Sequence, residues 1–219
     1  LTALTVGLIN GSLIRYAKFT AIAATLTMYI ALQGVSFLLR NEPGGYINAM
    51  VMNAVKAKVG PVPIAFFLLA VVTVLLELAL RKTRWGWRLR ATGSNEEAAR
   101  RVGVDVNKTN LLAYMTTSFF AFLGALILIS QLGVGDPTQG IAYTLTSITA
   151  VVLGGTSLLG GRGNFIGTLL GALLLVQVLN AIVFLGLTEM WQYTFQGLLI
   201  LTAAILYSVA RSRKKRTNS

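Results

Sequence analysis

Long apolar runs without an ionisable side chain dominate this chain of 219 residues. Six such windows occur, at 19–39, 59–76, 109–135, 137–161, 164–188 and 190–210. A helix needs about 20 apolar residues to cross about 30 Å of hydrocarbon. Strands of a membrane barrel would alternate apolar and polar positions, whereas LLGALLLVQVLNAIVFLG is apolar on both parities. The pattern predicts an all-α, polytopic helical membrane protein with about six full transmembrane helices.

Three segments modify this pattern. The opening LTALTVGLINGSLI is typical of a helix already in progress, so we expect one partial N-terminal helix and missing earlier helices. Residues 143–155 are short and rich in threonine, which leaves a broken or re-entrant element as an alternative to a full crossing. In 41–63, apolar residues repeat at three-to-four spacing and predict a helix in the membrane interface. These residues are Tyr46, Ile47, Met50, Val51, Ala54 and Val55.

The charged residues indicate how the helices are oriented. Only 12% of the residues are charged, against about 25% in soluble domains, yet the net charge is +12. The bases flank the apolar windows instead of forming a face with aromatic residues, so we expect a membrane partner and no nucleic acid. Lys and Arg mark the cytoplasmic side. An alternating path with residues 81–108 and the C-terminus inside leaves only Arg40, Lys56 and Lys58 outside.

Several kinds of chemistry lack their usual residues. The chain has no Cys and no His, which excludes thiolate chemistry, imidazole metal ligands and histidine-based catalysis. No Gly-Lys pair occurs, so the glycine-rich run 154–163 is not a phosphate-binding loop. We therefore expect no catalytic residue, no metal site and no cofactor in this chain.

The charged stretch ATGSNEEAARRVGVDV, residues 91–106, interrupts the apolar pattern. Ser94 followed by Glu97 is a capping-box pattern, and acidic residues in a first turn suit the helix dipole. Gly103 is a stop signal. The stretch predicts a helix at 94–101 that presents Ala98 and Ala99 as a small docking patch. The alternative is a solvated linker helix.

Small and polar residues inside the windows suggest two further roles. Gly163, Gly167 and Gly171 recur every four residues along a helix predicted at 165–185, a spacing that lets membrane helices pack closely. The glycine-rich run before them predicts a turn, with Arg162 at the membrane surface. Uncharged polar side chains in hydrocarbon face another helix or a watery path. The candidates for a translocation path are Thr25, Gln33, Thr117, Gln131, Thr149 and Asn180.

Two motifs resemble a known family. Residues 93–106 match G-x-N-x-x-A-A-x-x-x-G-[IV]-x-V, and residues 150–172 read AVVLGGTSLLGGRGNFIGTLLGA. Both are similar to motifs of the permease subunits of bacterial ATP-binding-cassette importers, in the branch for ribose, other monosaccharides and autoinducer-2. Members of that family are longer, and many have a proline near Thr20 or Ala21, which this chain lacks. The resemblance implies a single transmembrane permease domain over residues 1–219.

The resemblance also implies a function and partners. The chain would be a transport subunit rather than an enzyme, in the bacterial cytoplasmic (inner) membrane, and Mg-ATP would bind in separate ATPase subunits. A second permease subunit, an external solute-binding protein, a small polar solute and membrane lipid would be the other partners. A secondary transporter and an accessory scaffold subunit are the alternatives. The residues that the resemblance assigns to ATPase coupling are Gly93, Ser94, Asn95, Glu96, Glu97, Ala98, Ala99, Arg100 and Gly103.

Overall fold

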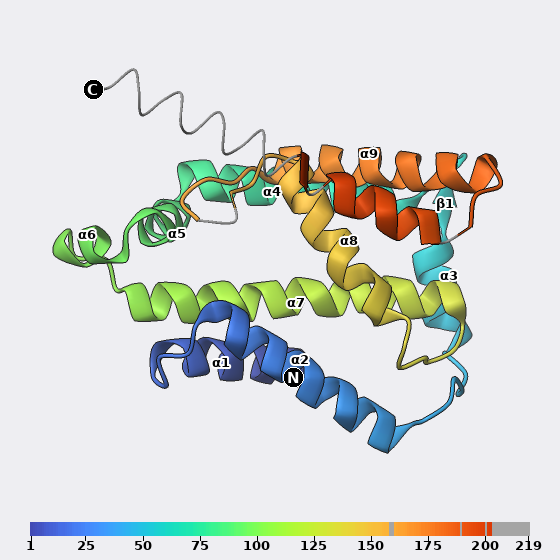
Figure 1. Ribbon diagram of the computed structural model, residues 1–219, viewed down its shortest axis with the longest axis horizontal. Coiled ribbons are helices and arrows are strands. Elements are labelled where there is room, and N and C mark those ends of the chain that lie inside the picture. The colour runs from blue at the N-terminus through green and yellow to red at the C-terminus, as the bar shows by residue number, and fades with distance from the viewer. Residues whose placement is uncertain (158–159, 189, 200, 203–219) are drawn as a thin grey trace. The chain divides into compact units, whose positions relative to one another are not determined.

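The computed structural model describes residues 1–157, 160–188, 190–199 and 201–202, and most of these are helical (Figure 1). The chain divides into two compact units, residues 1–140 and 141–219. The only named strands in the described part form a small antiparallel hairpin, in which β1 (Lys58–Val59) pairs with β2 (Val62–Pro63). The prediction of an all-α protein is confirmed.

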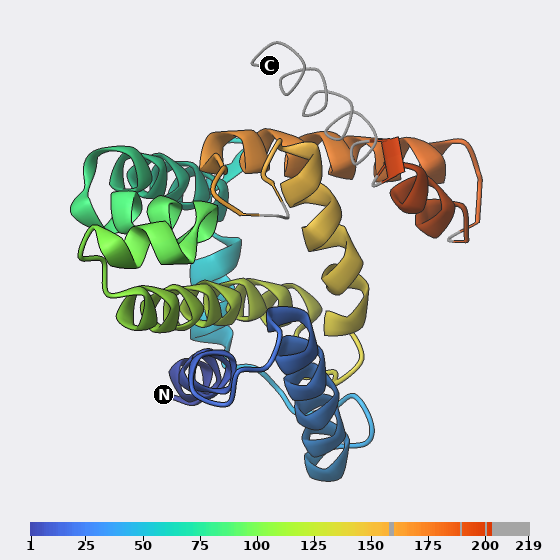
Figure 2. The same ribbon diagram turned by 60° about the vertical axis from the view of Figure 1, so that its left-hand side comes forward.

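Unit 1 contains seven helices among its described residues. They are α1 (Thr2–Arg15), α2 (Ala21–Leu39), α3 (Ala49–Lys56), α4 (Ile64–Lys82), α5 (Arg84–Ser94), α6 (Glu96–Arg101) and α7 (Val106–Leu132). In Figures 1 and 2, α1 lies alongside α7. The helix predicted in the first residues is therefore present.

The helix of the loop 41–63 is shorter than its apolar pattern suggests. Its first residue is Ala49, because the side chain of Asn48 caps the helix by accepting a hydrogen bond from the backbone N–H of Met50 at 2.9 Å. Tyr46 and Ile47 precede the helix, and α3 contacts α4 and α7. The predicted helix is confirmed over Ala49–Lys56 only.

Unit 2 begins in α8 (Gly140–Leu153) and continues into α9 (Phe165–Phe184). A turn joins them, in which Gly155, Gly160 and Gly161 have positive φ, as the glycine-rich run predicts. Residues 190–199 and 201–202 are helical, and the rest of the window 190–210 lies outside the described residues.

Four described helices are long and apolar enough to cross a membrane, namely α2, α4, α7 and α9. This number is below the predicted six for two reasons. The helix α8 has 14 residues, or about 21 Å at 1.5 Å per residue, which is short of the hydrocarbon thickness and favours the broken or re-entrant alternative. The sixth window is described only in part. The prediction of a multi-pass helical membrane protein stands.

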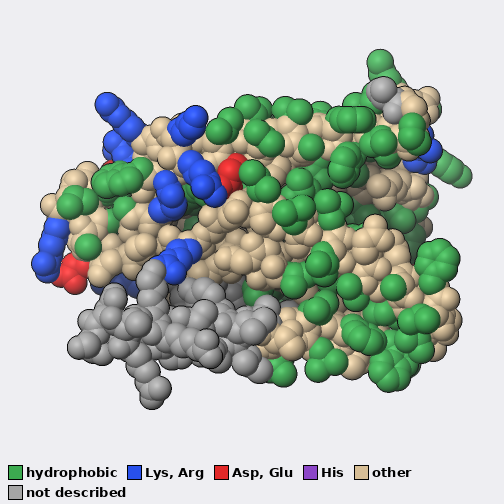
Figure 3. All heavy atoms as spheres, turned by 90° about the horizontal axis from the view of Figure 1, so that it is seen from above, with side chains coloured by type: hydrophobic (Ala, Val, Ile, Leu, Met, Phe, Trp, Pro, Cys, Tyr) green, Lys and Arg blue, Asp and Glu red, His purple; other side chains and the backbone are tan. Residues whose placement is uncertain are grey.

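Segments assigned to one side of the membrane gather at the same end of unit 1. The loops after α2 and α7 exchange backbone hydrogen bonds between Gly44 and Gly135, at 3.0 and 3.2 Å. Nearby, the side chain of Gln33 donates to the carbonyl of Pro137 at 2.9 Å. At the opposite end, Lys and Arg side chains gather over α4–α6 on the face that Figure 3 shows, whereas hydrophobic side chains cover much of the remainder.

Candidate functional site

The candidate site is the segment from α5 to the start of α7, which interrupts the apolar helices of unit 1. The chain leaves α4 through Thr83, whose hydroxyl caps α5 by accepting a hydrogen bond from the backbone N–H of Gly86 at 3.2 Å. Gly86 is buried, and a Cβ there would collide with the backbone of Leu80. A glycine at this position therefore allows α5 to fold back against the end of α4.

The cap of α6 differs from the predicted one. Ser94 is the last residue of α5, and the residue before α6 is Asn95, whose side chain accepts a hydrogen bond from the backbone N–H of Ala98 at 3.0 Å. The prediction that Ser94 caps the helix is wrong by one position, because the backbone at Ser94 still belongs to the preceding helix. The helix spans Glu96–Arg101 instead of 94–101, and both glutamates lie in its first turn.

The helix ends at a glycine, as predicted. Gly103 has φ of +82°, and its N–H donates to the carbonyl of Arg100 at 3.0 Å. The N–H of Val104 reaches back to the carbonyl of Ala99, also at 3.0 Å. These two bonds form a Schellman motif, in which the last carbonyls of the helix find donors and an apolar contact accompanies the turn.

Ala99 supplies that apolar contact. It is 2% exposed and packs in a small core with Val104 and Val106, with Ala91 against them. The prediction that Ala98 and Ala99 both form an outward patch is therefore wrong for Ala99, because the turn at Gly103 folds Val104 over it. Ala98 is exposed.

The outward face of α6 consists of Glu97, Ala98 and Arg101 together with Val102, the residue that follows the helix, and all four are exposed. Glu97 accepts a hydrogen bond from Arg101 one turn later at 2.6 Å, in a pair whose side chains are 76% and 77% exposed. Such a surface pair adds little stability. Val102 is 66% exposed and adds an apolar side chain to this face. This face combines a small residue, an apolar residue and both signs of charge.

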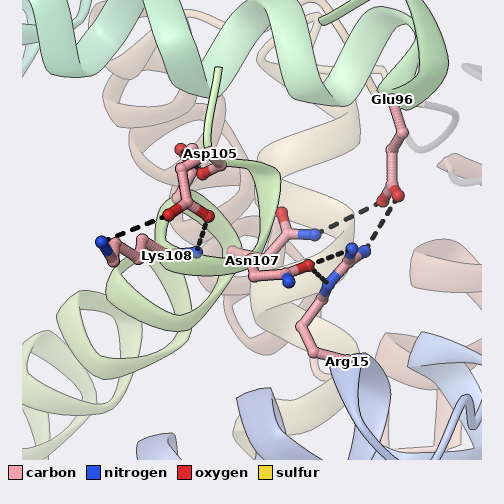
Figure 4. Close-up of polar contacts among 7 residues, drawn as sticks. Arg15, Glu96, Asp105, Asn107 and Lys108 are labelled. Carbon is pink, nitrogen blue, oxygen red and sulfur yellow. Dashed lines mark hydrogen bonds and ion pairs between the residues drawn. The ribbon is translucent and has the colours of Figure 1, made fainter. Parts of the chain in front are cut away.

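The opposite side of α6 is fastened by Arg15, the last residue of α1 (Figure 4). Its Nη1 donates to Oε2 of Glu96 at 2.9 Å, and its Nε donates to Oδ1 of Asn107 at 2.8 Å. Its Nη2 also donates to Asn107, and Asn110 donates to the second oxygen of Glu96 at 3.3 Å. We call Arg15, Glu96, Asn107 and Asn110 the Arg15 cluster. Sequence reasoning missed it because its members are up to 95 positions apart along the chain.

Asp105 caps the start of α7 beside this cluster. Its carboxylate accepts a hydrogen bond from the backbone N–H of Lys108 at 3.1 Å and lies 3.4 Å from the Lys108 ammonium (Figure 4). That backbone hydrogen bond is the main reason that the pKa of Asp105 is lowered from its ordinary value, and the nearby ammonium adds to it. Both helices that meet at this turn therefore begin with a side-chain cap.

The three predicted packing glycines do not share one helix. Gly163 precedes α9, which begins at Phe165 after its cap Asn164. Gly167 and Gly171 lie in α9, where an added Cβ would collide with the backbone of Gly154, the residue after α8, and at Gly171 also with that of Ala150 in α8. At Gly171 the backbone nitrogen of Gly154 would be 2.7 Å from that Cβ. Within unit 2, these glycines thus lie where the two helix backbones are closest.

A second close helix contact, in unit 1, was not predicted. Gly7 and Gly11 of α1 are both buried against α7. A Cβ at Gly7 would lie 2.8 Å from the Cα of Met115, and one at Gly11 would lie 2.8 Å from Cδ1 of Leu111. The signal was available, since residues 7–11 read GLING, a G-x-x-x-G pattern.

The structure gives the predicted path residues mainly local partners. Thr25, Thr117 and Thr149 donate to carbonyls one turn earlier in their own helices. Thr149 is 1% exposed, and Gln33 is engaged by the loop after α7. Gln131 and Asn180 are exposed, on α7 and α9. A role in a translocation path stays a prediction for all six.

This arrangement of apolar helices joined by an exposed, doubly capped loop helix is that of a multi-pass helical membrane protein. The chain belongs to the family described as branched-chain amino acid transport system / permease component, whose model matches residues 1–204. The predicted family of permease subunits is confirmed by this match and by curated relatives.

Three relatives illustrate the similarity. The chain is 34% identical over 207 residues to the ribose import permease protein RbsC of Escherichia coli (strain K12), covering 92% of this chain and 64% of the relative. It is 35% identical over 204 residues to RbsC of Bacillus subtilis (strain 168), covering 90% and 62%. It is 32% identical over 210 residues to the L-arabinose transport system permease protein AraH of E. coli (strain K12), covering 95% and 64%.

The chain thus spans slightly less than two thirds of the length of these relatives. No solved structure matches it significantly.

Proposed function

We propose that the chain is part of the transmembrane subunit of an ATP-driven importer for a sugar or a similar small polar solute. The names of the relatives support this proposal, since they are import permeases for ribose and a transport permease for L-arabinose. In this function the apolar helices line and support the path of the solute, and separate ATPase subunits bind Mg-ATP. The solute class rests on the relatives, because the polar residues of this chain do not select one sugar.

The outward face of α6 is the surface that meets the ATPase subunit. The observation that carries this assignment is that the residues of this short segment have two different roles. Glu96 and Ala99 attach the helix to the rest of unit 1, while Ala98, Arg101 and Val102 are exposed. A helix with caps at both ends keeps its shape without the partner, so binding costs little ordering entropy. Movement of the ATPase subunit would then displace the helices that flank the loop.

The positions of the charges support an orientation. Arg15 and the bases of α4–α6 lie at one end of unit 1, which we assign to the cytoplasm in the bacterial inner membrane. The opposite end, with α3 and the paired loops around Gly44 and Gly135, would face an external solute-binding protein. A second permease subunit, identical or related, would complete the path.

The test is retention of the ATPase subunit by the full-length protein. The double variant Ala98→Asp with Val102→Asp places two new carboxylates on the outward face. The amount of ATPase subunit that it retains should fall about tenfold or more, which is the loss typical of changes at the centre of a protein–protein interface. Ala98→Ser is the control, because it keeps a small neutral side chain, and it should bind as the wild type does. Ala99→Asp is unsuitable, since a buried charge would disturb the fold of the loop itself.

Two other functions predict different results. A secondary transporter or a scaffold subunit would hold no ATPase in any variant. If the wild type retains no ATPase subunit encoded with it, or if the double variant retains it fully, the assignment of α6 is wrong. Normal membrane insertion and gel filtration of the double variant separate lost binding from misfolding.

A further inference from the structure

The Arg15 cluster joins three helices that are not neighbours in sequence. Arg15 ends α1, Glu96 begins α6, and Asn107 lies in the first turn of α7 (Figure 4). The Arg15 side chain is only 11% exposed, although it carries a charge. A guanidinium is costly to bury unless its donors are used, and here three of its nitrogens donate to two partners.

Glu96 is held from two directions, which restricts how α6 can turn. One carboxylate oxygen receives Arg15 and the other receives Asn110. Because Glu96 is the first residue of α6, these contacts fix the beginning of the helix against α1 and α7. Within the part of the chain that the structure describes, the outward face has no comparable attachment, and its ion pair joins Glu97 to Arg101 within α6 itself.

The helix that carries Arg15 is itself tightly attached to α7. Gly7 and Gly11 bring the backbone of α1 against Leu111, Tyr114 and Met115. At Gly7 an added Cβ would lie 2.8 Å from both the Cα of Met115 and the carbonyl oxygen of Tyr114, so the two backbones are almost in contact there. We expect helices packed this closely to move together, because little deformable side chain separates them. A displacement of α6 that reaches Arg15 is therefore passed to α1 and α7 together.

We infer that Arg15 is a positioning residue that transmits movement of α6 into the α1–α7 helix pair. This inference rests on the proposed function, in which an ATPase subunit moves α6. The covalent connections of the loop lead only to α5 and α7, so Arg15 adds a third path, into a helix whose last residue lies 81 positions before the first residue of α6. Arg15 contacts neither the solute nor ATP in this role.

The experiment uses the full-length importer with its ATPase subunits and solute-binding protein, reconstituted in vesicles. Three quantities are measured for each variant: retention of the ATPase subunit, the rate of ATP hydrolysis, and solute taken up per ATP hydrolysed. In Arg15→Gln, retention should stay within about twofold of the wild type. Uptake per ATP should fall about tenfold, within the 5–150-fold range of typical couplings between sites.

Matched variants separate transmission from general damage. Lys18→Gln removes one exposed base three residues later and should leave the ratio unchanged. Glu96→Gln should lower the ratio as Arg15→Gln does, and the double variant should show no further loss, because both changes break one contact. Arg15→Lys keeps the charge but loses the fork that also reaches Asn107, so its ratio should be intermediate.

The outcomes are distinct from those of the docking test. If uptake and hydrolysis in Arg15→Gln fall together with their ratio unchanged, or if the losses from Arg15→Gln and Glu96→Gln add, Arg15 is a stabilising residue only and the inference is wrong. Should Arg15→Gln fail to insert, Arg15→Lys and Glu96→Gln decide by the same ratio. If the wild type itself retains no ATPase subunit, the proposed function is wrong.

Discussion

The loop helix α6 and the α8–α9 contact are held by opposite means. Side-chain contacts stabilise α6: Asn95 caps it, Arg15 forms an ion pair with Glu96, and Val104 packs over Ala99. In the α8–α9 contact side chains are absent where the helices are closest, and Gly154, Gly167 and Gly171 let the backbones touch. The difference follows from the surroundings of each region.

Water competes for the exposed polar groups around α6, so the shape of the helix depends on several weak contacts acting together, each with a modest net effect. In the membrane, lipid tails are as apolar as leucine side chains. An apolar helix face therefore gains little free energy when it leaves lipid and packs against another helix, unless the fit is close. Close packing then supplies the stability, and it tolerates no additional atoms. A single methyl group should therefore matter more in the α8–α9 contact than a lost hydrogen bond does near α6.

The largest effect is expected from Gly171→Leu. Its Cβ would collide with the backbone of Ala150 and Gly154, which cannot move aside as a flexible side chain can. We expect a loss of about 3 kcal/mol or more in the free energy of unfolding, measured by thermal unfolding of the full-length protein in nanodiscs. The control is Gly197→Leu in the same unit, where no atom of the described residues lies within 4 Å of an added Cβ. Equal melting temperatures for both variants would show that the contact is not close.

An intermediate effect is expected from Gly103→Ala, where conformation rather than space is limiting. Nothing lies within 4 Å of an added Cβ at Gly103, but its φ of +82° strains a residue with a side chain. The cost should be about 1–2 kcal/mol, confined to the end of α6 and visible as faster hydrogen exchange of the Val104 amide. Gly103→Asn should lose less, because asparagine tolerates this conformation better. Slower exchange in Gly103→Ala than in the wild type would contradict the expected strain.

The smallest effect concerns the pH dependence of the cap at Asp105. The pKa of this carboxyl lies below the ordinary value of about 3.9, and the hydrogen bond from the backbone N–H of Lys108 is the largest cause of this shift. The folded state therefore binds this proton less readily than the unfolded state. Stability from Asp105 is complete above the ordinary pKa and is lost as pH falls through the lowered value.

Carboxyl NMR titration of the full-length protein can check this sign. Lys108→Gln should leave the pKa of Asp105 below its ordinary value, because the backbone donor remains. Asp105→Asn should keep α7 capped and remove this contribution to the pH dependence. A pKa at or above the ordinary value in Lys108→Gln would show that the ammonium is the main cause.

The apolar windows and the two signals of the charged loop, a cap followed by a glycine stop, were sufficient to predict helices and the place of α6. The membrane imposes this simplicity, since a spanning segment must satisfy its own backbone as a helix. The exact cap was out of reach because Ser94 and Asn95 are both good caps, and only the path of α5 decides between them. The burial of Ala99 was out of reach for a similar reason, since it depends on where the chain turns after Gly103.

The sequence by itself determined the class of the protein, its family and the existence of a capped loop helix, because these depend on periodicity and on residues close together in the chain. Only the tertiary structure decided which glycines meet which backbone and which charges meet across the chain. Arg15 and Glu96 are 81 positions apart, and no local pattern links them. They meet because Gly7 and Gly11 let α1 pack closely against α7, although the two helices are far apart in the sequence.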